Sequence, residues 1–153
     1  MNHHTLTFKK LACALLLATS SVTFAASGDA KQQFQQAESL LKQAEYAQAF
    51  ALLKPAAEAG YVPAQAELAR QYMDEDAEYL DYAKAMQWAK KAAAANDPSG
   101  MNSIGYLYNN GYGVEEDNAE AMKWFVKAAN LGFAKSKYNV GKMYLDEQGV
   151  PRD

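Results

Sequence analysis

Cysteine and histidine are nearly absent from this chain. The one cysteine is Cys13 and the two histidines are His3 and His4, all close to the N-terminus. Residues 1–25 are predicted to be a cleaved signal peptide, so the mature chain would keep none of the three. Their loss excludes Ser-His-Asp and Cys-His catalysis, histidine acid-base chemistry, disulfides and ordinary zinc sites. The sequence therefore predicts a protein that is not an enzyme and needs no metal or cofactor.

The signal-peptide prediction rests on the order of charge and hydrophobicity at the N-terminus. Lys9 and Lys10 precede an apolar stretch at 11–18, which is much shorter than the roughly 20 residues of a transmembrane helix. Thr23 and Ala25 then provide the small residues that a cut after position 25 requires. We therefore expect export to the periplasm, with secretion as the second choice, and no membrane insertion after cleavage.

Clusters of basic residues are also missing. The chain has 15 basic and 18 acidic residues. Removing Lys9 and Lys10 with the signal peptide leaves 13 basic residues, so the mature net charge is −5. Nucleic acid is not an expected partner, because phosphate contacts need clustered lysine and arginine. The acidic run at 74–78 lacks the glycine and glutamate spacing of a calcium-binding loop and is interpreted as a solvated connection.

A repeat with a period of 36 residues organises the rest of the sequence. Trp88 recurs as Trp124, and Tyr72 recurs as Tyr108 and Tyr144. Two neighbouring positions repeat in the same way, as Leu68, Ile104 and Val140 and as Ala69, Gly105 and Gly141. Such a period predicts an all-α solenoid of stacked helical hairpins. Residues 26–153 are expected to form one repeat domain with units at about 29–60, 63–96, 97–132 and 133–153, the last of them incomplete.

Local signals place the helix ends within these units. Asp97, followed by proline, predicts the start of the third unit's first helix, and a glycine-containing loop at 111–114 ends it. Asp117 predicts the start of the second helix, and Gly132 its left-handed end. In the second unit Asn96 takes the place of that glycine. Each unit is therefore expected to be two antiparallel helices.

One family shares this motif. The third unit reads Gly105-x-x-Tyr108-x-x-Gly111-x-Gly113-Val114, then Ala121-Met122-x-Trp124 and Lys127-Ala128-Ala129-x-x-Gly132. It resembles the Sel-one-like repeat, a relative of the tetratricopeptide repeat, and the resemblance extends over about residues 31–153. The resemblance implies a right-handed α-solenoid that acts as an adaptor for other proteins and is often exported in bacteria. Glu147 departs from the motif, which usually has a loop glycine there.

The candidate binding surface follows from the same resemblance. In tetratricopeptide-type solenoids the first helix of each unit lines a concave face. Amides and tyrosine hydroxyls on that face could bond a peptide backbone, and basic side chains could hold carboxylates. The alternative is an ordinary solvated face. The candidate partner-binding residues are Ala66, Arg70, Met73, Asn102, Tyr106, Asn109, Tyr138 and Lys142.

The sequence thus predicts a non-enzymatic adaptor that binds a protein or peptide on its concave face. One alternative is an immunity or inhibitor protein that neutralises a toxic effector enzyme. A more remote one is a hydrolase of the cell wall or of β-lactams, as suggested for cysteine-rich relatives. Self-association is a further expectation, because Val140 and Tyr144 in the last unit would lack their usual cover.

Overall fold

A computed structural model of the chain describes residues 29–146 and shows that they fold into α-helices without strands. The predicted signal peptide and Glu147 lie outside the described residues. The helices are α1 (Ala30–Lys42), α2 (Tyr46–Glu58), α3 (Val62–Gln71), α4 (Tyr82–Ala94), α5 (Pro98–Asn110), α6 (Asn118–Asn130) and α7 (Ala134–Leu145).

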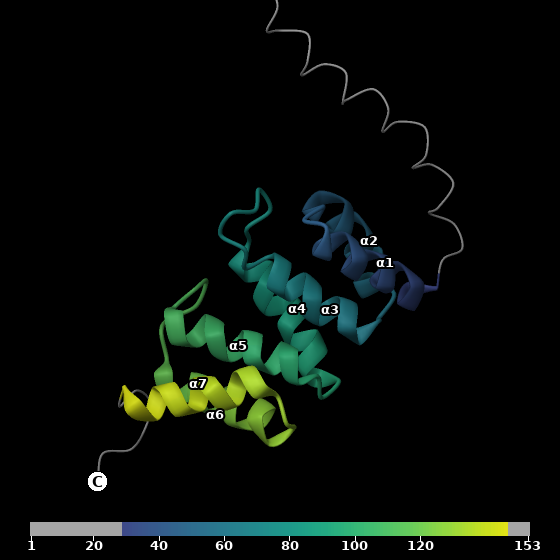
Figure 1. The fold of residues 1–153 in the computed structure, drawn as a ribbon. Helices are drawn as coiled ribbons and strands as arrows, with labels where there is room; N and C mark the ends of the chain where they lie inside the picture. Colours follow the sequence, from purple (N-terminus) through teal and green to yellow (C-terminus); the bar gives the residue numbers. More distant parts are fainter. Residues whose placement is uncertain (1–28, 147–153) are drawn as a thin grey trace, which may run out of the picture.

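The helices form hairpins that follow one another along the molecule. Each helix packs on the helices next to it in sequence, and α3 also contacts α5. Figure 1 shows the α1–α2 hairpin at one end, followed by α3–α4 and α5–α6, with α7 beyond them. The predicted all-α repeat fold is confirmed. The first helices α3 and α5 therefore lie side by side, and hydrogen bonds from Asn102 join α5 to α7, so these three helices form a common face.

Residues in the left-handed conformation separate the hairpins at the predicted positions. Gly60 has φ +88°, Asn96 has φ +62° and Gly132 has φ +88°, and these residues are 36 positions apart. Glycine has no Cβ to clash in this conformation, and asparagine tolerates it better than most other residues. The prediction that Asn96 replaces a terminal glycine is confirmed. The same backbone reversal therefore repeats with the period of the sequence.

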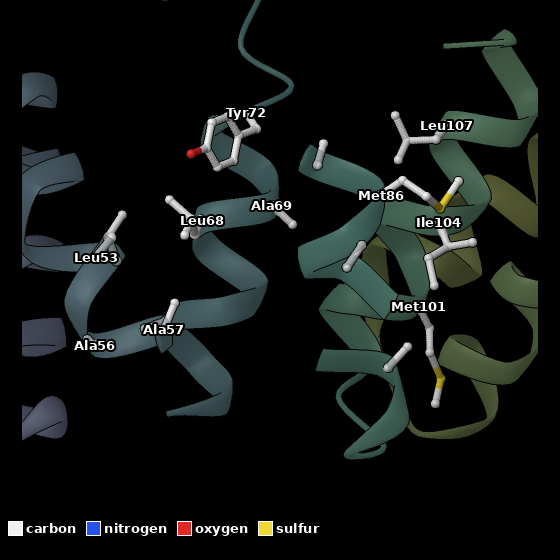
Figure 2. Close-up of a cluster of buried hydrophobic side chains, with 14 of the residues drawn as sticks. Leu53, Ala56, Ala57, Leu68, Ala69, Tyr72, Met86, Met101, Ile104 and Leu107 are labelled. Carbon is white, nitrogen blue, oxygen red and sulfur yellow. The ribbon is translucent and has the colours of Figure 1, made fainter. Parts of the chain in front are cut away.

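The core runs between the hairpins and consists of the repeated apolar positions. Leu53 of α2 and Leu68 of α3 are both fully buried, and Figure 2 shows them facing each other. On the other side of α3, Ala69 points toward α4, where its small side chain allows close approach. Ile104 occupies the position of Leu68 in the next repeat and is also fully buried. Burying each large side chain stabilises the stack by roughly 1.5–3 kcal/mol.

The last described helix lacks part of this cover. Tyr144 is 60% exposed, whereas Tyr72, at the same repeat position, is 6% exposed. A Cβ built on Gly141 would meet no atom within 4 Å. Tyr144 therefore does not fill space between hairpins as Tyr72 does, because no described helix packs on that side of α7. Self-association through this side stays a prediction.

Candidate partner-binding surface

A hollow of about 540 Å³ lies on the face formed by the first helices. We call it the first-helix hollow. It is built by α3, the loop after it, α5 and the start of α7. Its walls combine apolar, hydroxyl and charged side chains from residues that lie far apart in the sequence: Arg70, Met73, Asp74, Glu75, Asp76, Ser99, Asn102, Ser103, Tyr106, Phe133 and Lys135.

Arg70 reaches the hollow from the last turn of α3. Its Nε donates to Glu67 Oε2 at 2.9 Å, and its second guanidinium nitrogen donates to Glu67 Oε1. These hydrogen bonds to Glu67 raise the pKa of Arg70 above its usual value. Gln71 Nε2 donates to the same carboxylate at 2.7 Å. The guanidinium is therefore held in place, and a partner's carboxylate would have to share it with Glu67.

Tyr106 and Met73 give the hollow an apolar surface. Tyr106 is 39% exposed, and its ring lies edge-on to Tyr112 at 5.9 Å between centroids. Met73 is partly buried and packs against the main core. Tyrosine at such a position offers both a ring and a hydroxyl to a partner.

Asn102 lines the hollow but serves mainly to join two hairpins. Its side chain is only 7% exposed, and its Oδ1 accepts hydrogen bonds from Ser136 Oγ at 2.9 Å and from Asn139 Nδ2 at 3.0 Å. Both donors belong to α7. The amide oxygen therefore already accepts two hydrogen bonds within the protein.

The other candidate residues lie outside the hollow. Ala66 is 4% exposed and sits in the packed interior of the hairpins. Asn109 donates from Nδ2 to Asn118 Oδ1 at 2.6 Å, which ties α5 to α6. Tyr138 is 70% exposed and Lys142 is exposed, both on α7. The structure thus brings together Arg70, Met73, Asn102 and Tyr106, and a binding role for any of these residues stays a prediction.

The acidic loop between α3 and α4 lines the first-helix hollow, although the sequence pattern did not predict this. Glu75 Oε1 accepts a hydrogen bond from Tyr112 Oη at 3.1 Å, across 37 positions of sequence. This bond, together with the charge of Glu75, raises the pKa of Tyr112. The bond joins the loop to the next hairpin, and Asp74 and Asp76 of the same loop also line the hollow. Only the unusual length of this loop hinted at such a role.

Within residues 29–146, no three histidine, cysteine, aspartate or glutamate side chains converge as a metal site would require. Over the same range, every helix is too short or too polar to cross a membrane.

Stacked hairpins whose first helices share one face define an α-helical repeat scaffold. The Sel1 repeat profile matches four stretches of the chain, at residues 39–61, 62–97, 98–133 and 134–153. The chain belongs to the Sel1 repeat family. Folds of this family are typically scaffolds for protein–protein interaction.

Solved structures that are similar to this chain include the following two. One is c5321, described as a protective antigen present in uropathogenic Escherichia coli strains displaying an SLR fold, with 36% identity and a TM-score of 0.71. The match covers 82% of this chain and 28% of that one. The other is a Sel1 repeat protein from Oxalobacter formigenes, with 28% identity, a TM-score of 0.68, and coverage of 81% and 52%. This chain thus spans about a quarter of the length of the first protein and about half of the length of the second. Among curated proteins, none matches the sequence.

Proposed function

We propose that this chain is a non-enzymatic adaptor of the periplasm that binds an extended segment of another protein in the first-helix hollow. The observation that carries the proposal is the convergence of three first helices and one loop on a single hollow of about 540 Å³. Family membership supports a protein as the partner. The predicted signal peptide supports the location.

The walls of the hollow suit a peptide of mixed character. Tyr106, Phe133 and Met73 supply apolar contact for a side chain, while Ser99 and Ser103 place hydroxyl groups beside them. Extended segments bind in this way when backbone hydrogen bonds accompany pockets for alternate side chains. The hollow is therefore suited to a short stretch of chain more than to a flat protein surface.

The charged residues of the first-helix hollow indicate which kind of partner segment it favours. Three carboxylates line the hollow against two cations, Arg70 and Lys135, and Arg70 is already paired with Glu67. A segment with net positive charge is therefore favoured over an acidic one. From the sequence, Arg70 and Lys142 are the residues that could hold acidic side chains or a carboxylate of a partner; Lys142 does not line the hollow.

Capture of a partner from a periplasmic extract tests the proposal. The purified protein serves as bait, and the double variant Met73→Ala, Tyr106→Ala should lower capture by about tenfold or more, because it removes two of the apolar contacts that the hollow offers. The control is Lys54→Ala, Lys90→Ala, which truncates two exposed side chains on α2 and α4. Circular dichroism should show unchanged helix content in both variants. Undiminished capture by the Met73 and Tyr106 variant would place the interface elsewhere.

A further inference from the structure

A second hollow, of about 460 Å³, lies where the start of α2 meets the loop between α3 and α4. Its walls are mostly apolar and include three aromatic rings, from Tyr46, Phe50 and Tyr79. We call it the aromatic hollow. Tyr106 and Phe133 do not line it, so its aromatic walls differ from those of the first-helix hollow.

The rings of the aromatic hollow are held in place by their neighbours. Phe50 stacks on Tyr79 with centroids 4.1 Å apart and planes inclined by 23°, and it meets Tyr72 edge-on at 5.3 Å. Tyr79 Oη donates to Oε1 of Gln71 at 3.4 Å, and Gln71 is only 2% exposed. Tyr46, which is 50% exposed, stands at the rim. The rings of Phe50 and Tyr79 are therefore held in place before any ligand arrives, which lowers the entropic cost of binding.

Carboxylates surround these rings. Asp74, Asp76 and Glu78 all line the hollow, and no lysine or arginine does. Among the residues that the structure describes, none of the three forms an ion pair. The negative charge of Asp74 contributes to the raised pKa of Arg70, but the guanidinium forms its hydrogen bonds with Glu67 and not with Asp74. The hollow thus presents negative charge around aromatic faces, which repels anions and attracts cations.

We propose that the aromatic hollow binds one cationic side chain, lysine or arginine, of a partner protein. A cation over an aromatic face is attracted by the negative potential of the ring, and nearby carboxylates add to that attraction. The chain forms the same kind of contact within itself: Lys91 Nζ lies 3.9 Å from the ring centroid of Trp88, and Lys127 Nζ lies 4.3 Å from that of Trp124.

This inference goes beyond the proposed function because it concerns a different site and a defined ligand group. The two hollows share Asp74 and Asp76, which separate them, whereas Tyr46 and Glu78 line the aromatic hollow alone. Substitutions at Tyr46 and Glu78 therefore test the aromatic hollow without altering the lining of the first-helix hollow.

The test is a titration of the purified protein with two short peptides, followed by the aromatic NMR signals of Phe50 and Tyr79. The first peptide is Ac-Gly-Arg-Gly-amide. The second replaces arginine by citrulline, which keeps the shape and removes the charge. We expect saturable shifts with the arginine peptide, weakened by salt, and shifts with the citrulline peptide that are far smaller. Equal shifts with both peptides would overturn the proposal.

A pair of matched variants locates the binding. Tyr46→Ala, Glu78→Gln should weaken binding of the arginine peptide about fivefold, since each removes one exposed contact with the cation. Tyr144→Ala, Glu115→Gln makes the same chemical changes at exposed positions elsewhere and should leave binding unchanged. If the two double variants weakened binding of the arginine peptide equally, the peptide would not bind in the aromatic hollow.

Tyr106→Ala separates this proposal from the proposed function. It alters the first-helix hollow only, so binding of the arginine peptide should persist. If Tyr106→Ala abolished the shifts while Tyr46→Ala, Glu78→Gln did not, the cation would belong to the first-helix hollow and the present inference would be wrong.

Discussion

At the scale of single residues, two glycines at the same repeat position have different surroundings. Gly105 lies on α5, where a Cβ would come within 2.7 Å of Cδ1 and Cε1 of Phe125. Phe125 is 2% exposed, so its ring has little room to move away. Gly141 lies 36 residues later on α7, where a Cβ would meet nothing within 4 Å. Of these two positions, therefore, only Gly105 requires the absence of a side chain for packing.

We predict that Gly105→Ala lowers the free energy of unfolding by about 1–3 kcal/mol, the usual cost of overpacking a core. Gly141→Ala is the control and should be neutral or stabilise by up to about 1 kcal/mol, because alanine favours the helix. Urea denaturation of the two variants and the parent measures both values. An equal response at the two positions would show that α5 and α6 are not closely packed at Gly105.

At the scale of the helices, aspartate side chains begin α5 and α6, as the sequence predicts at Asp97 and Asp117, and Asp81 begins α4 in the same way. The Oδ1 atoms of Asp81, Asp97 and Asp117 accept hydrogen bonds from backbone N–H groups three residues on, at 2.9, 2.8 and 2.8 Å. Each bond satisfies an N–H that has no partner within its own helix. These signals lie within a few residues of one another, and for this reason the helix starts could be predicted.

Asp81 makes this capping testable by titration. The backbone N–H of Lys84 is the largest cause that lowers the pKa of Asp81 below its ordinary value of about 3.8, and the Lys84 ammonium adds to it. Because the pKa is lowered in the folded state, the ionised carboxylate stabilises α4 above pH 3.8, and this stability is lost as the pH falls through the folded value. We predict that Lys84→Met returns the pKa only part of the way, since the backbone donor remains.

NMR titration of the Asp81 carboxyl carbon in the parent and in Lys84→Met measures both pKa values. Lys123→Met is the control, because that ammonium pairs with Glu120 and not with Asp81. If the pKa of Asp81 returned fully to its ordinary value in Lys84→Met, the ion pair with Lys84, and not the backbone hydrogen bond of the helix cap, would be the cause of the lowered pKa.

At the scale of the whole molecule, polar bonds join one hairpin to the next. Tyr112 is tied to Glu75 across 37 positions, and Asn102 is tied to Ser136 across 34. In a solenoid each repeat contacts only its neighbours, so the loss of one such tie should loosen one junction and leave distant hairpins unaffected.

We predict that Asn102→Ala releases α7 selectively. The substitution leaves the fully buried Ser136 hydroxyl without its acceptor, at a cost of about 1–3 kcal/mol. Hydrogen exchange should show faster exchange of the α7 amides, while those of α1 and α2 keep their protection. Asn110→Ala is the control, because Nδ2 of Asn110 donates to Tyr106 O within its own helix and lies exposed. Uniform loss of protection along the chain would instead indicate a single cooperative unit.

The sequence by itself determined the hairpins and their repetition. The 36-residue period, the aspartates before helix starts and the left-handed residues at Asn96 and Gly132 all act over a few residues or over a fixed spacing. Such signals depend little on how one hairpin sits on the next. They could therefore be recognised without coordinates, and they also led to the correct family.

Only the tertiary structure decided which side chains reach the binding surface. Ala66 turned inward and the amide of Asn109 bonded within its hairpin, while Asp74 and Asp76 came to line both hollows. These outcomes depend on the angle between hairpins and on the bond from Tyr112 that holds the acidic loop. The bond from Tyr112 joins residues 37 positions apart, and helical periodicity carries no information about such a contact.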